Sequence, residues 1–323
     1  MAETTKPRKS PLATILLIVT IIGATAFWYY ALYAPIDFEM AEESDSFALL
    51  TANTNATELV IDIDADIGEF SIDLLPEGSN NSVNADWTYT YLIDPQQSPN
   101  PAINISVTEV TVGNVLTISI FIDQDEAVDA FHIVNLEFSL AFANNFTLVD
   151  IIGDFSAASV IMDLDGGNFG DIYLDSAAGS YDLTFTNCNF LGDLVFQTEV
   201  GSIELEWEDN IVSNTTLVDL NTNVGSIAVD WTQRVSLTAN VEINLATDTG
   251  SIEFDALIKN SSAKFDIVWD TSVGSSDIDY ENGESVGEDH YQTLNYESLL
   301  IPTIFLDASA SVGAVDITID TYF

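Results

Sequence analysis

Two acidic segments carry the side chains best suited to binding a metal ion. They contain Asp163, Asp165 and Asp171 in the first segment and Asp277 and Asp279 in the second. Carboxylate and backbone oxygens in flexible loops are the ligands that Ca²⁺ prefers. A glycine is displaced in each segment relative to known calcium-loop patterns. These incomplete patterns favour plain acidic turns at strand ends, with Ca²⁺ as a cofactor as the alternative.

Side chains suited to catalysis are scarce. The chain has two histidines, His132 and His290, and one cysteine, Cys188. The sequence contains no Cys/His zinc pattern, nucleophile elbow, phosphate-binding loop or HExxH motif. Paired carboxylates are so common that no pair stands out as the acid and base of a glycosidase. We predict that the protein is not an enzyme, with a polysaccharide-active enzyme as a distant alternative.

The net charge limits the possible partners. Six Lys and Arg residues stand against 52 Asp and Glu residues, which gives a net charge of −46. A surface this negative repels phosphate backbones, so nucleic acid is excluded as a partner. With 47% hydrophobic residues, the chain can still bury a core.

The first 33 residues predict a membrane anchor. An uncharged run from Leu12 to Tyr33 is long enough, as a helix, to cross a bilayer. Three basic residues precede this run, and every acidic residue except Glu3 follows it. This bias predicts a single-pass protein of the cell membrane, with a cytoplasmic N-terminus and an extracellular C-terminal domain.

Two alternatives keep most of the chain outside the cell. Ala24-Thr25-Ala26 fits the cleavage site of a secretory signal, although the apolar run continues to Tyr33. The stretch from Arg8 to Val19, RKSPLATILLIV, resembles the N-termini of archaeal type IV pilin-like proteins. That resemblance implies a filament subunit whose N-terminal helix forms the filament core.

Six N-x-S/T sequons are compatible with an external location. They place candidate glycosylation sites at Asn55, Asn80, Asn104, Asn145, Asn214 and Asn260.

From residue 176 onward the chain repeats a pattern centred on glycine. The glycines are Gly179, Gly201, Gly225, Gly250, Gly274 and Gly313, with spacings of 22, 24, 25, 24 and 39 residues. A period near 24 with a fixed glycine is typical of stacked structural repeats. The longest spacing contains an additional acidic loop over residues 281–296.

Apolar and polar residues alternate within each unit, which predicts strands on both sides of the glycine. If the units stack in register, Trp207 and Trp231 lie one above the other in the core. A serine or threonine three residues before most of the glycines is expected to bond backbone groups at the bend. A β-sandwich of ordinary hairpins is the alternative, because its strands recur at similar spacing.

The same stacking predicts columns of outward carboxylates three and five residues after the glycines. Like charges about 5 Å apart repel one another, so screening by salt or bridging by Ca²⁺ is expected. The candidate calcium ligands are Asp163, Asp165, Asp171, Asp230, Asp255, Asp277 and Asp279.

Units of the form T-x-x-G-S-I-x-(apolar)-x-(aromatic), as in Thr198–Trp207 and Thr222–Trp231, resemble the adhesin family of cell-surface β-solenoid proteins. The resemblance covers most of residues 55–323. It implies a non-enzymatic surface protein and supplies no catalytic residues.

We therefore predict an all-β protein, a repetitive β-solenoid with about 24 residues per rung, preceded by one N-terminal transmembrane helix. The predicted parts are a cytoplasmic tail (1–11), a transmembrane helix (12–33), a tether (34–50), an N-terminal β region (51–150) and the repeat β-solenoid (151–323). The predicted role is adhesion or cell-envelope structure without catalysis. Its expected partners are the lipid bilayer, through residues 12–33, and other cell-surface proteins or glycans.

Overall fold

The computed structural model describes residues 39–50, 55–93, 103–124, 133–259, 262–294, 296–298 and 300–322. The chain divides into two units, Met1–Ala41 with Leu92–Asn100, and Glu42–Tyr91 with Pro101–Phe323. In the first unit the described residues are 39–41 and 92–93, which lie at strand ends. The second unit contains the sheet and the core.

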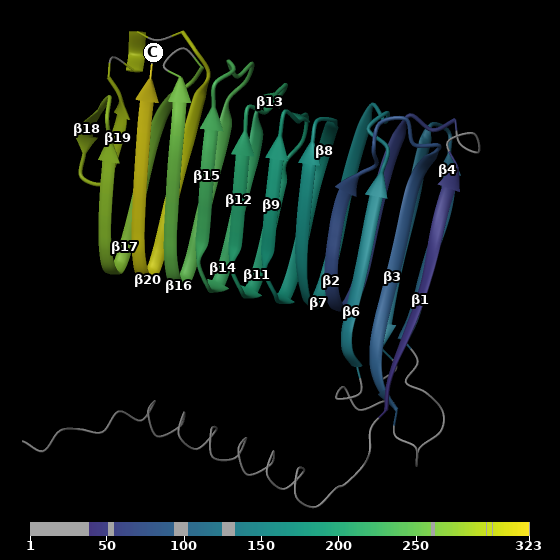
Figure 1. Ribbon diagram of the computed structural model, residues 1–323. Coiled ribbons are helices and arrows are strands. Elements are labelled where there is room, and N and C mark those ends of the chain that lie inside the picture. The colour runs from purple at the N-terminus through teal and green to yellow at the C-terminus, as the bar shows by residue number, and fades with distance from the viewer. Residues whose placement is uncertain are drawn as a thin grey trace, which may run out of the picture. The chain divides into compact units, whose positions relative to one another are not determined.

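Twenty strands form one hydrogen-bonded sheet in the described part of the chain (Figure 1). The first seven are β1 (Glu39–Leu50), β2 (Glu58–Leu74), β3 (Asn81–Ile93), β4 (Ile103–Val112), β5 (Val115–Gln124), β6 (Ile133–Phe142) and β7 (Leu148–Asp165). The next eight are β8 (Asn168–Ala178), β9 (Tyr181–Thr186), β10 (Asn189–Phe190), β11 (Leu194–Val200), β12 (Ile203–Glu208), β13 (Ile211–Val212), β14 (Thr216–Val224) and β15 (Ile227–Gln233). The last five are β16 (Val241–Lys259), β17 (Lys264–Tyr280), β18 (Gly283–Gly287), β19 (His290–Thr293) and β20 (Thr303–Tyr322), with a 3₁₀ helix, η2 (Tyr296–Ser298), before β20.

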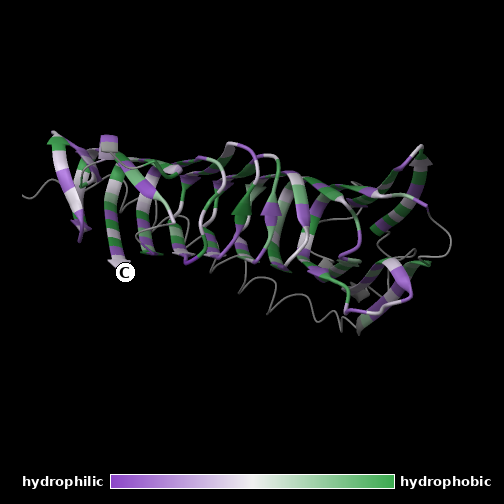
Figure 2. Cartoon of the chain, turned by 90° about the horizontal axis from the view of Figure 1, so that it is seen from above, coloured by the Kyte–Doolittle hydropathy of each residue, from purple (hydrophilic) through white to green (hydrophobic). Residues whose placement is uncertain are grey.

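Alternation of apolar and polar residues forms these strands and buries one face of each. In β12, Ile203, Leu205 and Trp207 are buried, whereas Glu204 and Glu206 are exposed. The same alternation runs along most strands in Figure 2. Successive side chains of a strand point to opposite faces, so a period of two gives one buried and one solvated face.

The strands form two layers, which we call the pre-glycine and post-glycine layers after their position relative to the repeated glycine. In the pre-glycine layer the order is β4–β5–β2–β7–β8–β11–β14–β16–β20–β17–β19–β18. In the post-glycine layer the order is β3–β6–β2–β7–β9–β12–β15–β16–β20–β17. Because β2, β7, β16, β20 and β17 run through both layers, hydrogen bonds close the strands into a ring.

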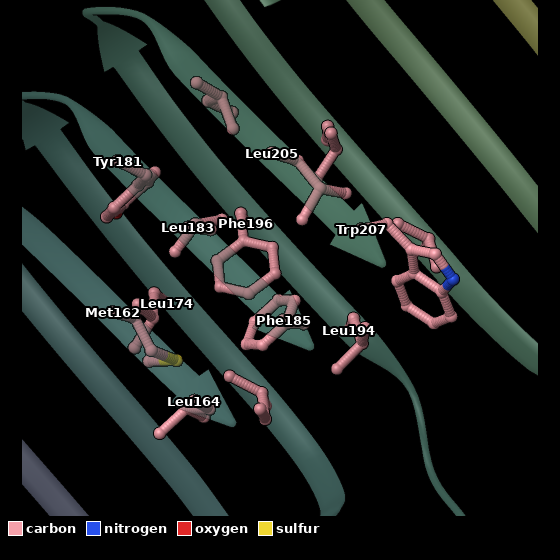
Figure 3. Close-up of a cluster of buried hydrophobic side chains, with 14 of the residues drawn as sticks. Met162, Leu164, Leu174, Tyr181, Leu183, Phe185, Leu194, Phe196, Leu205 and Trp207 are labelled. Atoms are coloured by element: carbon pink, nitrogen blue, oxygen red, sulfur yellow. The ribbon is translucent and has the colours of Figure 1, made fainter. Parts of the chain in front are cut away.

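The core lies between the two layers. Side chains such as Leu174, Leu183 and Phe196 meet there from opposite layers (Figure 3). The Trp207 and Trp231 rings stack with centroids 4.1 Å apart and planes 9° apart. These two residues are direct register partners of β12 and β15. The prediction that the tryptophans stack in register is confirmed.

At each bend the glycine lets neighbouring units approach closely. A Cβ atom added to Gly225 would lie well inside 3.0 Å of the Gly201 carbonyl oxygen, and Gly201 is related to Gly179 in the same way. The column continues through Gly250, Gly313 and Gly274. The space that a side chain would need is thus filled by the backbone of the next unit.

Threonine hydroxyls bond the same carbonyls. Thr222 Oγ1 donates to the Gly201 carbonyl at 3.0 Å, and Thr247 Oγ1 donates to that of Gly225 at 3.2 Å. Both threonines are buried. The expectation that hydroxyls three residues before the glycine bond the backbone at the bend is therefore confirmed at these units.

Spatial order departs from chain order at both ends of the stack. The last strand, β20, lies between β16 and β17 and pairs in parallel with both. At the other end β2 lies between β7 on one side and β5 and β6 on the other. The strand that precedes the long insertion, β17, is followed by the antiparallel hairpin β18–β19, which pairs along it.

The predicted β-solenoid is wrong, although the predicted all-β content is correct. A coil that advances one rung at a time would keep β17 beside β16, whereas β20 separates them. Antiparallel pairs β3–β6, β4–β5 and β17–β19 also belong to the same sheet. The alternative of hairpins is not followed in the repeats either, because neighbouring units pair in parallel.

The predicted fold class also included an N-terminal transmembrane helix. The described residues contain no helix that is long and apolar enough to cross a membrane. Residues 1–33, on which the cytoplasmic tail, the anchor and the pilin-like alternative depend, lie outside the described residues. Residues 39–50 of the predicted tether form β1, and β7 continues across the predicted boundary at residue 150.

Replacing Gly225 by alanine is expected to destabilise the protein by about 3 kcal/mol or more, because the new Cβ overlaps a backbone oxygen that cannot rotate away. Gly113→Ala is the control: its φ is also positive, at 67°, but no atom lies within 4 Å of the added Cβ. The control should lose about 1 kcal/mol. Urea denaturation measures both, and equal losses would refute the close-approach argument.

Trp231→Ala is expected to cost about 3–5 kcal/mol in unfolding free energy, as a buried aromatic truncation. Trp231→Phe should cost less, because a ring remains and Trp231 Nε1 has no hydrogen-bond partner among the described residues. The two variants are compared by urea denaturation. A loss below 1 kcal/mol for the alanine variant would contradict the stacked core.

Candidate functional site: a groove across β16, β20, β17 and β19

An open groove of 510 Å³ lies on the outer face of the pre-glycine layer, at the C-terminal end of the stack. It crosses four adjacent strands, β16, β20, β17 and β19. Its lining residues are Glu242, Asn244, Asp266, Val268, His290, Phe305, Leu306 and Asp307. We refer to it as the C-terminal groove.

Strand register places the lining side chains in two rows. Glu242, Phe305 and Asp266 are successive partners across β16, β20 and β17. Asn244, Asp307 and Val268 form the second row, two residues further along the same strands. Neighbouring strands lie about 4.8 Å apart, so each row is a compact strip of side chains. The groove exists because β20 inserts between β16 and β17.

The β18–β19 hairpin supplies one side of the groove and fixes Asp266. His290 Nε2 lies 2.6 Å from Asp266 Oδ1, and Gln292 Nε2 donates to Asp266 Oδ2 at 3.1 Å. An ionised carboxylate can accept but not donate, so the His290 ring nitrogen that faces it carries the proton. The hairpin thus positions Asp266 by two hydrogen bonds.

Contacts with the core hold the hairpin in place. The Trp269 and Tyr291 rings lie with centroids 5.5 Å apart, and the Phe265 backbone N–H donates to Thr293 Oγ1 at 2.8 Å. Tyr280 and Thr293 bond through their hydroxyls at 2.6 Å. His290 therefore lies on a structured hairpin, because the additional loop expected over residues 281–296 contains the strands β18 and β19.

The C-terminal groove is negative and partly apolar. Glu242, Asp266 and Asp307 contribute carboxylates, while Phe305 and Val268 are 38% and 44% exposed. Its lining includes no lysine or arginine and no hydroxyl or thiol side chain. The His290–Asp266 pair therefore has no nucleophile to activate among the lining residues. The arrangement is suited to holding a ligand by polar and ring contacts.

The predicted calcium ligands are dispersed. Asp163 and Asp165 project from β7, and Asp230 pairs with Asp255 on the outer face of the post-glycine layer. Asp279 does not continue this column, because Thr318 of β20 lies between it and Asp255. In the part of the chain that the structure describes, no three acidic, histidine or cysteine side chains gather to hold a metal ion. Calcium binding stays a prediction.

Asp171 and its equivalents have a structural role. Asp150 Oδ1 accepts a hydrogen bond from the Asp171 backbone N–H at 3.0 Å, and Asp171 Oδ1 accepts one from that of Asp193, also at 3.0 Å. Asp193 Oδ1 in turn accepts from the Leu217 N–H at 2.9 Å. Successive aspartates thus link successive units where the pre-glycine strands begin. Asp277, the remaining predicted ligand, is paired with Asp316.

The other residues singled out in the sequence lie as follows. Cys188 is buried, and burial raises the pKa of its thiol to about 12, so it stays protonated at neutral pH. His132 and the sequon at Asn260 lie outside the described residues. The remaining sequons are exposed, at Asn55, Asn80, Asn104, Asn145 and Asn214. Glycosylation stays a prediction.

Sequence reasoning missed the residues that make up the groove, apart from noting His290. Phe305, Glu242 and Asp307 occupy ordinary outward positions of strands, and their types alone carry no motif. An exposed phenylalanine between two carboxylates becomes visible only when the order β16–β20–β17 is known.

No known protein family matches the chain, and no curated protein matches it either. Solved structures that resemble it include a proposed cell adhesion protein from Clostridium sporogenes ATCC 15579, with a TM-score of 0.42, 11% identity, and coverage of 87% of this chain and 100% of that one. A proposed adhesin from Bacteroides fragilis NCTC 9343 has a TM-score of 0.34 and 8% identity, and the match covers 85% of this chain and 96% of that one. A proposed lipid-binding protein from Parabacteroides distasonis ATCC 8503 has a TM-score of 0.27 and 10% identity, and the match covers 85% of this chain and 96% of that one. Scores this low do not establish a shared fold or function.

The outward carboxylates predict that salt stabilises the protein. Glu204 pairs with Asp182 and Asp230 pairs with Glu206 on parallel strands, so like charges repel at short range. We expect the melting temperature to fall in low-salt buffer with chelator and to rise toward 1 M NaCl. If ions bind specifically, millimolar Ca²⁺ will restore stability more efficiently than Na⁺. A melting temperature indifferent to both would contradict the repulsion.

Acid is expected to stabilise the protein as the pH falls toward the pKa of an unfolded aspartate. Asp64, Asp154 and Asp175 are successive register partners. Partial burial, and then the charge of Asp154, raise the pKa of both Asp64 and Asp175 above 3.8. A raised folded-state pKa gives stability that is complete below the unfolded pKa and is lost as pH rises through the folded pKa.

Urea midpoints at pH 5 and pH 7 test this. The midpoint should be higher at pH 5, and Asp154→Asn should reduce the difference more than Asp248→Asn, a control at an exposed position of β16. A urea midpoint that is lower at pH 5 than at pH 7 would contradict this prediction.

Proposed function

We propose that this chain is a non-catalytic adhesion protein that acts outside the cell and contacts its ligand through the C-terminal groove. The observation that carries the proposal is the groove itself, in which an exposed ring and fixed polar groups lie on adjacent strands. Ligand sites typically combine a concave surface, an apolar contact and a few positioned polar groups.

The rest of the described surface supports a binding role in the extracellular medium. Outward positions of β12 and β16 are mostly acidic or hydroxyl side chains, which favour the solubility of a β-protein with a high negative charge. The exposed position of every described sequon is compatible with this location. Stacked parallel units give a rigid support, so a ligand bound at one end is held at a defined place.

Phe305→Ala is expected to reduce attachment of protein-coated beads to cells of the source organism by about tenfold, as the truncation of an aromatic hot spot. The full chain is used, and folding of each variant is checked by its urea midpoint. Phe121→Ala is the matched control, because Phe121 is also an outward phenylalanine, 42% exposed, at the other end of the stack. Equal attachment by both variants and the unaltered protein would overturn the proposal.

A further inference from the structure

We propose that the C-terminal groove accepts a cationic side chain, that of a lysine in an exposed segment of a partner protein. This inference rests on the proposed function, since it names the ligand chemistry of the same groove. It follows from three features of the groove: the neighbours of Phe305, the hydrogen bonding of each carboxylate, and the absence of lysine and arginine from the lining.

Carboxylates flank the exposed ring on both sides. Phe305 is the register partner of Glu242 on β16 and of Asp266 on β17. Asp307 lies two residues further along β20, on the same face as Phe305. An ammonium group over the face of Phe305 would therefore be attracted both by the ring and by carboxylates around it. A ring in this setting favours a cation more than a neutral or anionic group.

Two of the three carboxylates are available to a ligand. Asp266 already accepts hydrogen bonds from His290 and Gln292. Glu242 and Asp307 are exposed, and among the described residues neither side chain takes part in a hydrogen bond or an ion pair. An ammonium group has three donors and no acceptor, which matches a site that offers acceptors on two sides.

The same chemistry occurs inside this protein. Lys264 Nζ lies 4.1 Å from the centre of the Tyr296 ring, and it also donates to the Tyr296 carbonyl oxygen at 3.3 Å. Lys264 begins β17, the strand that carries Asp266. An ammonium group held by an aromatic face and oxygen acceptors is thus an arrangement that this end of the fold already stabilises.

Other occupants fit the lining less well. A metal ion needs several oxygen ligands around one point, and the described residues contain no such cluster. An anion is repelled by three carboxylates, and the lining contains no lysine or arginine to attract it. A second copy of this chain, which also carries a net charge of −46, is repelled as well. A basic segment of another protein complements the charge and also places a lysine stem against Val268.

The test uses the full chain and a fluorescein-labelled peptide of alternating lysine and glycine, with binding followed by fluorescence anisotropy at 150 mM NaCl. The same peptide with acetylated lysines, and a neutral tetrasaccharide as competitor, are the comparison probes. The groove variant Glu242→Gln/Asp307→Asn removes two charges. Its control, Glu204→Gln/Glu206→Gln, removes two outward charges from β12 on the other layer.

We expect the groove variant to weaken lysine-peptide binding about tenfold and Phe305→Leu to weaken it about fivefold, with the control pair and Phe121→Leu within about twofold. Acetylation should abolish the binding. Equal losses in the groove variant and the control pair would show attraction to the overall negative field and would overturn the inference. Displacement of the peptide by the neutral tetrasaccharide, or binding of the acetylated peptide with the same affinity, would also overturn it.

The two proposals fail differently. If Phe305→Ala reduces attachment to cells while the lysine peptide shows no preference for the groove, the adhesive function stands and the cationic ligand is wrong. If the peptide binds as expected but attachment to cells does not depend on Phe305, the ligand chemistry stands and the adhesive role is wrong.

Discussion

The contact between a glycine Cα and the carbonyl oxygen of the glycine in the next unit sets the geometry of the repeat region. From Gly179 to Gly274 the backbone of one unit occupies the volume that a Cβ of the next would need. The units can therefore bend at the same place and at the same spacing, and a parallel register follows from that shared bend. Because Thr222 and Thr247 donate to the same carbonyl oxygens, the close approach leaves those acceptors bonded rather than buried and unpaired.

Register fixed at the bend has opposite effects on the two faces of each strand. On the inner face it superimposes apolar side chains, so that Trp207 stacks on Trp231 and the core continues from unit to unit. On the outer face it superimposes carboxylates such as Glu204 and Asp182. Burial of large side chains stabilises each added unit by several kcal/mol, whereas the outward repulsion is reduced by water and salt. The fold therefore tolerates a high negative charge on its outer faces, although the same charges would be strongly destabilising in the core.

Local patterns in the sequence were sufficient to predict the strands, the bends and the register between adjacent units. Glycine spacing and a period of two depend on residues close together in the chain, and both are confirmed at Gly201 and Gly225. The order of the units at the ends was not predictable in this way. Units with similar patterns can pair with several partners, and the choice of β16 and β17 as neighbours of β20 depends on contacts between distant segments. The groove was missed for the same reason, since Phe305 meets Glu242 and Asp266 only through that choice.

The position of β20 also determines how this strand resists force and proteolysis. A terminal strand at the edge of a sheet frays and can be peeled away one hydrogen bond at a time. β20 is instead paired in parallel along both sides, with β16 from Ile304 to Tyr322 and with β17 from Thr303 to Ile319. Pulling it lengthwise loads two rows of hydrogen bonds in shear at once, and its removal would open the ring of strands. β20 is therefore held between its two neighbours, and we do not expect unravelling of the sheet to begin from that strand.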